Sequence, residues 1–294
     1  MSRQARVVAQ AKVNLLLRVL AREASGYHSI ETVFQRIDLG DDVVVRVAGG
    51  RSLDCAGPAM PAEGLGPVEK NLAYRAAVAY ADATGWPAGF AIEIQKRIPV
   101  GGGMGGGSAD AGAVLRALDA LAPAPLGPRL VELAAELGAD VPFMTAESPL
   151  AFAWSRGERM LALPPLPPRP LVLLAPGFGV GTAEAYGWVA EERGAYRPEP
   201  RLHVPADFAT WDDIERVAHN DFERVVARRQ PRVAELVDVL AAAGARPAMM
   251  SGSGSTVFGV FESPPDLAAL SRSSEATPIL TTTSARVVRV AIDV

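Results

Sequence analysis

A glycine-rich segment constrains the fold of this chain more than any other feature. Residues 98–112 read IPVGGGMGGGSADAG, and six of the seven residues from 101 to 107 are glycine. Glycine accepts positive φ angles and lets a ligand approach the main chain closely, so that successive N–H groups can surround an anion. The segment therefore predicts a loop that binds a polyphosphate.

The residues on either side of the loop favour this interpretation. Residues 90–98, FAIEIQKRI, alternate apolar and polar side chains as a half-buried strand does. Residues 108–121 predict a helix for which Ser108 is a suitable N-cap, and the N-terminus of a helix favours negative groups. A flexible glycine linker is the alternative, but a linker is not usually placed between a strand and a capped helix.

Three kinds of glycine loop can be distinguished here. The P-loop requires a lysine after its last glycine, whereas Ser108 follows Gly107 directly. The dinucleotide-binding fingerprint fits only loosely, because no early βαβ unit and no suitably placed acid accompany it. The strand, the P-x-G-G-G-x-G-G-G-S loop and the helix together resemble the second motif of the GHMP kinase superfamily.

The rest of the chain mixes helical and strand patterns in an order that does not alternate, which is typical of an α+β protein. A Pro-rich connector, PPLPPRP at 164–170, is the best candidate for a domain boundary. Residues 51–66 predict a loop. Further strands are expected at 7–8, 13–19, 37–47, 171–175 and 287–292, and within 249–261 after a Gly/Ser turn. Further helices are expected at 71–84, 129–137, 182–193, 214–228 and 233–243.

Composition excludes several classes of protein. The net charge of −4 argues against a nucleic-acid partner, and no apolar run approaches the roughly 18–20 residues of a membrane span. The single cysteine, Cys55, cannot form an intrachain disulfide, and no signal peptide is apparent. We therefore expect a cytoplasmic enzyme. Its 29 basic residues include only three lysines, at positions 12, 70 and 96, so a lysine can mark a role that arginine cannot fill.

Other segments extend the resemblance over nearly the whole chain, to the family of 4-diphosphocytidyl-2-C-methyl-D-erythritol kinases within the GHMP superfamily. The more specific part is AKVNLLLRV at 11–19 followed by GYHSIETVFQRIDLGD at 26–41. The other segments are KNLAYRAA at 70–77, GADVPF at 138–143, GFGVGTAEAY at 177–186, HNDFE at 219–223 and MMSGSGSTVFGVF at 249–261.

The resemblance implies a fold and a reaction. The fold would be α+β, with an N-terminal ribosomal protein S5-like domain at 1–163 and a C-terminal ferredoxin-like domain at 164–294. The enzyme would use ATP with Mg²⁺ to phosphorylate the 2-hydroxyl of the cytidine diphosphate methylerythritol substrate in the non-mevalonate isoprenoid pathway. The active site would lie in a cleft between the two domains.

The resemblance also implies a catalytic pair, Asp140 as base and Lys12 as the lysine that orients it. An alcohol that accepts a phosphoryl group gains from a carboxylate that takes its proton, and a nearby ammonium keeps that carboxylate ionised. The residues alone favour a turn or cap role for Asp140 and an edge-strand position facing water for Lys12, and the resemblance reverses this preference.

The family pattern assigns substrate contacts to Asn14, Tyr27, His28, Thr182 and Tyr186. An aromatic face can stack on a pyrimidine and a histidine can hydrogen-bond its edge. Core packing is the alternative for Tyr186. The pattern assigns ATP contacts to Asn71, Lys96, Pro99, Val100, Gly101, Gly102, Gly103, Met104, Gly105, Gly106, Gly107, Ser108 and Ala109.

Several points stay open from the sequence. Lys96 could be a solvent-facing strand residue, and Asp110 could interact with the helix dipole or with Mg²⁺. The turn at 251–255 is expected to support the phosphate site. The protein ligands of the metal are unknown, and a monomer or a homodimer is expected.

Some segments depart from the family pattern, and other functions remain as alternatives. Residues 154–158 read WSRGE, whereas the family pattern has a glycine-containing turn before the Gly-Glu pair, and residues 164–170 and 271–284 are expected to form surface loops. A GHMP kinase acting on mevalonate, homoserine or a sugar is one alternative, although the Tyr27-His28 pair argues against it. A non-catalytic nucleotide-binding protein is the other, and Lys12 with Asp140 argues against that.

Overall fold

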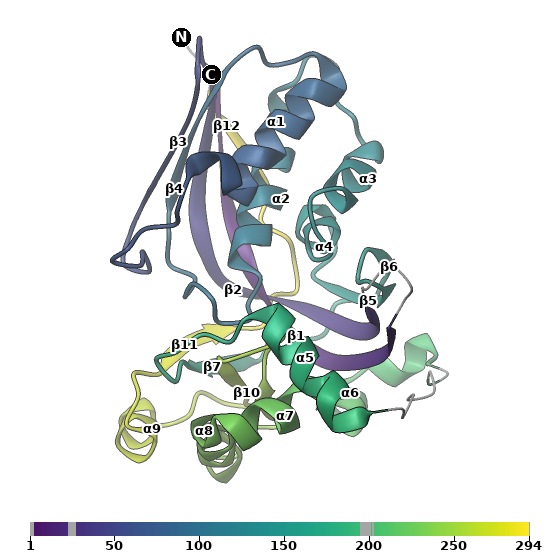
Figure 1. Cartoon of the computed structure of the whole chain (residues 1–294), viewed down its shortest axis with the longest axis vertical. Coiled ribbons are helices and arrows are strands. Elements are labelled where there is room, and N and C mark those ends of the chain that lie inside the picture. Colours follow the sequence, from purple (N-terminus) through teal and green to yellow (C-terminus); the bar gives the residue numbers. More distant parts are fainter. Residues whose placement is uncertain (1–2, 23–27, 195–200, 202, 294) are drawn as a thin grey trace.

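The chain folds around two β-sheets. The computed structural model describes residues 3–22, 28–194, 201 and 203–293. The larger sheet stands in the upper part of Figure 1 and the smaller one, with four strands, in the lower part. The larger sheet contains β1 Gln4–Arg22, β2 His28–Val47, β3 Arg51–Ala56, β4 Phe90–Gln95, β5 Leu150–Ser155, β6 Arg159–Ala162, β8 His219–Asn220 and β12 Ala291–Asp293. The smaller sheet contains β7 Pro170–Leu174, β9 Ala248–Met250, β10 Val257–Val260 and β11 Ile279–Thr282.

Two long antiparallel strands connect the parts of the molecule. β1 has 19 residues and β2 has 20, longer than the separate short strands expected at 7–8, 13–19 and 37–47. Their register shifts at three places, the first between Gln10 and Lys12. A bulge bends a strand and redirects its groups. At this one, the Lys12 N–H leaves the ladder and donates to the carbonyl oxygen of Met104 in the glycine loop, at 3.1 Å.

Helices cover one face of the larger sheet. The central one, α2 Gly106–Leu121, packs on both β1 and β2 and buries a run of alanine and leucine side chains. Gly112 lets it approach α4, because a Cβ at Gly112 would lie 2.6 Å from the Met144 carbonyl group. The other helices of this part are α1 Leu72–Thr84, α3 Arg129–Ala135 and α4 Val141–Thr145, with a 3-10 turn at Val68–Lys70.

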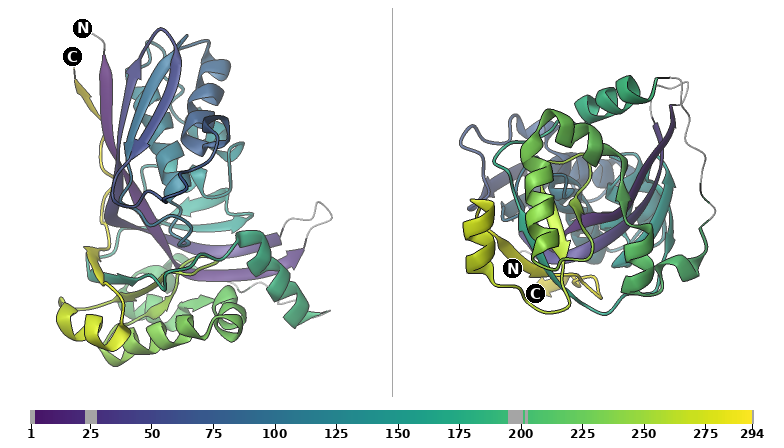
Figure 2. Two further views of the ribbon diagram at one scale, coloured as in Figure 1. Left: turned by 60° about the vertical axis from the view of Figure 1, so that its left-hand side comes forward. Right: turned by 90° about the horizontal axis from the view of Figure 1, so that it is seen from below.

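The smaller sheet is buried on both faces. Successive side chains of a strand point to opposite faces. In β7, Leu171 and Leu173 pack in the core of the larger sheet and its helices. Val172 and Leu174 pack in a second core formed with the following helices. α8 and α9 cover this sheet from below and lie in front of it in the right-hand view of Figure 2. The helices of this second core are α5 Thr182–Arg193, α7 Asp221–Arg229, α8 Pro231–Ala242 and α9 Leu267–Ser274. α6 Trp211–Val217 and a 3-10 turn at Pro205–Phe208 instead bury Trp211, Ile214 and Phe208 in the core of the larger sheet. Among the described residues, no helix combines the length and the hydropathy that a membrane span requires.

The last part of the chain returns to the first sheet. β12 pairs with β1, so the two ends of the chain lie side by side in both views (Figures 1 and 2). The expectation of a surface loop at 271–284 is wrong, because this segment contains the end of α9 and strand β11 and ends at buried Ser284. The Ser284 hydroxyl accepts from Gln10 Nε2 at 2.7 Å and donates to Asp38.

Three further element predictions were wrong. The helix expected at 214–228 is divided into α6 and α7, because residues 219–220 pair with β1 as the short strand β8. The loop expected at 51–66 begins with β3, which pairs in parallel with β4. The strand expected to begin at Val287 is confined to residues 291–293. The mixed, non-alternating order confirms the α+β class. The division after residue 163 stays a prediction, and β8 and β12 from beyond it join the larger sheet.

A buried cluster of charges fixes the entrance to the glycine loop. Lys96, just after β4, donates to Asp41 of β2 and to Asp110 of α2, the latter at 2.6 Å. All three residues are at most 3% exposed. Asp41 also accepts from the backbone N–H of Ile98 at 2.8 Å. The cluster therefore joins two strands, the main chain before the loop and the helix after it.

One ammonium faces two carboxylates in this cluster, so its protonation depends on the fold. Burial raises the pKa of Asp110 to about 7 from 3.8, with the Asp41 carboxylate adding to the rise and Lys96 opposing it. Although burial alone would lower the pKa of Lys96, the two carboxylates raise it. Because this pKa lies near 7, Asp110 is close to half protonated at neutral pH.

We predict that Asp110→Asn reduces the pH dependence of stability. Because the folded protein holds the Asp110 proton up to about pH 7 and the unfolded chain does not, this group stabilises the fold fully below about pH 4 and loses that contribution as the pH rises to about 7. Asparagine imitates the protonated acid. Between pH 5 and pH 8, the stability of the variant relative to the wild type should rise by about 1–2 kcal/mol.

Urea denaturation at several pH values measures this difference. Asp82→Asn, the same change at an exposed position of α1, is the matched control and should give curves parallel to the wild type. Parallel curves for Asp110→Asn as well would contradict the prediction.

Candidate active site

One cavity of about 1360 Å³ brings together most of the residues singled out from the sequence. Its walls come from the glycine loop, from β1 and β2, from the segment before α4, and from the start of α5 with the turn after β9. Both sheets therefore contribute to it. The predicted site residues that line it are Lys12, Asn14, His28, Asn71, Lys96, Pro99, Val100, Gly101, Gly102, Gly103, Met104, Gly105, Gly106, Gly107, Ser108, Asp140, Thr182 and Tyr186.

The glycine loop requires its glycines for two reasons. Gly101, Gly103 and Gly105 have φ angles of 75°, 77° and 69°, which side chains disfavour. The loop also packs directly on the turn after β9. A Cβ at Gly102 would lie 2.4 Å from Thr256 Oγ1, and one at Gly103 would lie 2.2 Å from the Ser251 carbonyl oxygen. Substitution at either position would push the loop away from the turn.

The helix after the loop begins earlier than predicted. Gly105 is the N-cap of α2 and Ser108 is its third residue, so the predicted cap role of Ser108 is wrong. The cause is that Gly106 and Gly107 already adopt the helical conformation. No side chain caps this end. Its first turn, Gly106 to Ser108, lines the cavity, where backbone N–H groups and the helix dipole favour an anion.

Ala109 differs from the other loop residues predicted to contact ATP. It does not line the cavity but lies in the core at 2% exposure. Its backbone N–H donates to the Gly105 carbonyl oxygen at 2.8 Å. Ala109 therefore supports the helix rather than presenting a group to a ligand.

Lys12 and Asp140 face each other across the cavity. Lys12 Nζ lies 3.6 Å from Asp140 Oδ2, 2.6 Å from Asn14 Oδ1 and 2.9 Å from the Gly103 carbonyl oxygen. Lys12 is 3% exposed, and burial lowers the pKa of its ammonium while Asp140 opposes that change. The structure thus contradicts the alternative of an edge-strand lysine facing water.

Asp140 remains partly open to the cavity. It is the N-cap residue of α4, yet its side chain makes no capping hydrogen bond and is 31% exposed. The carboxylate is thereby available to a ligand and held near an ammonium. This arrangement places a carboxylate and an ammonium together at the wall of the cavity.

Asn14 is oriented by a short chain of hydrogen bonds. Its Nδ2 donates to Thr32 Oγ1 at 2.8 Å, and the Thr32 hydroxyl donates to the Leu16 carbonyl oxygen at 2.7 Å. The amide oxygen of Asn14 is therefore directed at Lys12. Both residues lie on β1 two positions apart, which places them on one face of the strand.

An aromatic surface forms the opposite end of the cavity. The rings of His28 and Tyr186 stack at 4.5 Å with an interplanar angle of 12°, and Phe222 meets Tyr186 edge-on at 4.8 Å. Burial raises the pKa of Tyr186 to about 12, with the Asp140 charge adding to it, so its phenol stays neutral. Thr182 Oγ1 lies 3.2 Å from Ser253 Oγ. Tyr27 lies outside the described residues.

Lys96 and Asn71 lie on the other side of the loop. The alternative of a solvent-facing strand residue is wrong for Lys96, because its ammonium is buried between Asp41 and Asp110. The ion pair also replaces the helix-dipole role considered for Asp110. Asn71 caps α1, since its Oδ1 accepts from the Ala73 N–H at 2.9 Å.

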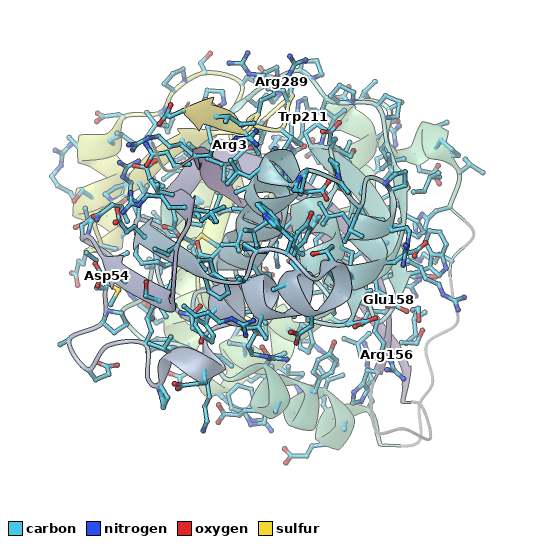
Figure 3. All side chains as sticks on the ribbon, turned by 90° about the horizontal axis from the view of Figure 1, so that it is seen from above. Arg3, Asp54, Arg156, Glu158, Trp211 and Arg289 are labelled. Carbon is cyan, nitrogen blue, oxygen red and sulfur yellow. The ribbon has the colours of Figure 1, made fainter. Side chains whose placement is uncertain are left out.

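The cavity includes residues that the sequence did not single out as site residues. Arg156 and Glu158 line it and lie close together (Figure 3), and Glu158 Oε2 accepts from the Arg156 N–H at 2.8 Å. Ser155, before them, has a φ of 66°, a conformation in which glycine is usual. The departure from the family pattern at 154–158 was the signal that pointed here. Phe222 and Ser253 gave no individual signal.

The described part of the chain contains no group of three or more His, Cys, Asp or Glu side chains that could hold a metal ion. The carboxylate of Asp140 and the hydroxyl of Ser108 supply hard oxygen atoms in the cavity wall.

Comparison with known proteins identifies the family. Residues 71–148 match GHMP kinases N terminal domain, and residues 206–275 match GHMP kinases C terminal. The chain is 40% identical over 260 residues to a 4-diphosphocytidyl-2-C-methyl-D-erythritol kinase of Citrifermentans bemidjiense, covering 87% of this chain and 89% of that protein. It is 43% identical over 260 residues to a protein of the same name from Pelotomaculum thermopropionicum, with 86% and 88% covered.

A solved structure agrees with these matches. The crystal structure of a 4-(cytidine 5'-diphospho)-2C-methyl-D-erythritol kinase superposes with a TM-score of 0.76 at 37% identity, covering 95% of this chain and 99% of that one. The predicted α+β fold with two GHMP kinase domains is thereby confirmed. The chain belongs to the GHMP kinases and, within them, to the 4-diphosphocytidyl-2-C-methyl-D-erythritol kinase family.

Proposed function

We propose that this enzyme transfers the γ-phosphate of ATP to the 2-hydroxyl of 4-diphosphocytidyl-2-C-methyl-D-erythritol, as its relatives' names indicate. The observation that carries the proposal is the combination of groups in the wall of one cavity. The Lys12–Asp140 pair lines it together with the glycine loop, which suits a polyphosphate, and the His28 and Tyr186 rings, which suit a pyrimidine.

In this mechanism Asp140 accepts the proton of the 2-hydroxyl as the oxygen attacks the γ-phosphorus. Lys12, held by Asn14 and the Gly103 carbonyl oxygen, orients Asp140 and places positive charge where the phosphoryl group passes. The bond from oxygen to the γ-phosphorus forms, and the bond from the γ-phosphorus to the β-γ bridging oxygen breaks. ADP leaves, and no covalent enzyme intermediate is needed.

ATP binding would rest on the main chain of the loop. The N–H groups of the first turn of α2 face the phosphates, and Asn71 and Lys96 support the nucleotide side of the loop. We propose that Mg²⁺ arrives with ATP and neutralises phosphate charge when bound. The buried ion pairs of Lys96 indicate that it acts by fixing the loop entrance.

The cytosine ring would stack on the surface formed by His28 and Tyr186, with Tyr27 expected beside it. Thr182 and Asn14 would supply polar contacts to the rest of the substrate. Thr182 is exposed at the N-terminus of α5, and its hydroxyl lies close to the Gly/Ser turn. This position supports a contact of Thr182 with the substrate close to the phosphate site.

The direct test of function is an ADP-release assay with Mg-ATP and a panel of acceptors. We expect turnover with the cytidine diphosphate methylerythritol compound and none with mevalonate, homoserine or galactose. Turnover with one of the other acceptors would keep the kinase reaction and reject the cytidine pocket. ATP binding without turnover on any acceptor would favour a non-catalytic protein.

Asp140→Asn should lower kcat by about 10²–10⁴-fold, the usual contribution of a general base, and leave the Kd for ATP nearly unchanged. The amide keeps the shape of the side chain but cannot accept the proton. Single-turnover kinetics and ATP titration calorimetry measure the two quantities. Turnover within a few-fold of the wild type would show that Asp140 is not the base.

Tyr186→Ala should raise the KM for the cytidine substrate by roughly 5–150-fold, because stacking on a base is worth about 1–3 kcal/mol. The KM for ATP should change less than about twofold. Tyr186→Phe is the matched control, since it keeps the aromatic face and loses only the hydroxyl, and it should behave like the wild type. Equal changes in both KM values for Tyr186→Ala would remove the cytosine role.

A further inference from the structure

Residues 219–223, His-Asn-Asp-Phe-Glu, contact both ends of the active site without reaching its reacting groups. They form β8 and the first residues of α7. The backbone of His219 and Asn220 pairs in parallel with β1 at Leu16 and Leu17, a few residues beyond Lys12 and Asn14. The segment is therefore fixed to the same strand that carries the catalytic lysine.

Two of its side chains hold the turn after β9. Asn220, at 5% exposure, donates from Nδ2 to the carbonyl oxygens of Met250 and Gly252, both at 2.8 Å. Its Oδ1 caps α7 by accepting from the Phe222 N–H at 2.9 Å. Glu223 Oε2 accepts from the Met250 N–H at 2.7 Å. The turn is thus anchored at Met250, the last residue of β9, and at Gly252.

The turn after β9 also sets the position of the glycine loop. The Ser251 hydroxyl donates to the Gly103 carbonyl oxygen at 3.1 Å, the same oxygen that accepts from Lys12 Nζ. A Cβ at Gly252 would lie 2.7 Å from this oxygen. Because this contact leaves so little space, a shift of the turn would shift the loop and the oxygen that holds Lys12.

The other side chains of the segment hold the substrate wall. Asp221 Oδ2 accepts from the Val19 N–H at 2.6 Å and pairs with Arg193 Nη2 at 2.7 Å, and Arg193 also donates to the Val19 carbonyl oxygen. Arg193 is the last residue of α5, the helix that carries Thr182 and Tyr186. Phe222, at 2% exposure, supports the Tyr186 ring edge-on.

Asp221 is ionised at neutral pH. Burial alone would raise its pKa, but hydrogen bonds from His219, Arg193 and the Val19 N–H lower the pKa to about 2. His219 Nε2 lies 2.9 Å from Asp221 Oδ1 and holds the second oxygen. The carboxylate is therefore a fixed anchor between β1 and α5.

We infer that residues 219–223 are a positioning segment that holds the ATP loop and the cytidine wall in register with β1, with Asn220 and Glu223 acting on the loop and Asp221 and Phe222 on the wall. The inference rests on the proposed function. It assigns two of these residues to the ATP loop and two to the cytidine wall. Variants of the two pairs are therefore expected to weaken the binding of different ligands.

The test measures binding of ADP and of cytidine diphosphate methylerythritol to the full chain by titration calorimetry. Asn220→Ser keeps a capping hydroxyl but cannot reach the two carbonyl oxygens. It should raise the Kd of ADP about tenfold and change that of the cytidine compound less than about twofold. Asp221→Asn should raise the Kd of the cytidine compound about three- to tenfold, with that of ADP nearly unchanged.

Glu191→Gln is the matched control, because Glu191 joins α5 to α7 through an exposed ion pair with Arg229 at 2.7 Å and touches none of these anchors. Both Kd values should stay at the wild-type level. If Asn220→Ser does not fold, Glu223→Ala removes the other anchor of the turn and carries the same expectation.

The outcomes separate the inference from the function on which it rests. Equal weakening of both ligands, or of neither, in the two variants would indicate a merely structural role and overturn the inference alone. Failure of the wild-type chain to bind the cytidine compound would reject the proposed function, and the inference with it. Weaker binding of ADP alone in Asn220→Ser, with weaker binding of the cytidine compound alone in Asp221→Asn, would support the inference and the proposed function.

Discussion

The contact between the glycine loop and the turn at residues 251–256 is the constraint on which the active site depends. The Gly103 carbonyl oxygen lies at its centre, where it accepts from both Lys12 Nζ and the Ser251 hydroxyl. The backbone N–H of Thr256 donates to the neighbouring Gly102 carbonyl oxygen at 3.3 Å. The loop comes from one sheet and the turn from the other. Their packing therefore fixes the two halves of the molecule and Lys12 at the same point.

Buried charge is concentrated around this contact. Two of the three lysines in the sequence, Lys12 and Lys96, are nearly inaccessible to solvent, and each has carboxylate or carbonyl partners. Burying an ammonium is costly unless its hydrogen bonds are satisfied, so both lysines constrain their surroundings strongly. Lys12 constrains the wall of the cavity beside Asp140. Lys96 does so beneath the loop, where Asp41 and Asp110 tie the preceding strand to the following helix.

Local patterns predicted the elements whose stability is local. The helix at 182–193 and the strand of 90–98 appear close to where periodicity placed them, with α1 ending at Gly85 as expected. Local sequence patterns predicted the wrong element where a segment pairs with a distant part of the backbone. Residues 214–228 look helical in isolation, yet 219–220 pair with β1 and divide the helix. Lys96 looks like an exposed strand residue, because its two partners lie 55 and 14 positions away.

The sequence by itself determined the family, the polyphosphate-binding character of the loop and the identity of the chemical groups, since these depend on residue type and short spacing. Only the tertiary structure decided which groups meet. The bulge in β1 turns the Lys12 N–H to the loop, α4 presents Asp140 to Lys12, and α5 brings Tyr186 onto His28. These contacts join residues more than 90 positions apart, and their geometry comes from the packing of the smaller sheet and its helices against the end of β1 and the start of β2, the long strands of the larger sheet.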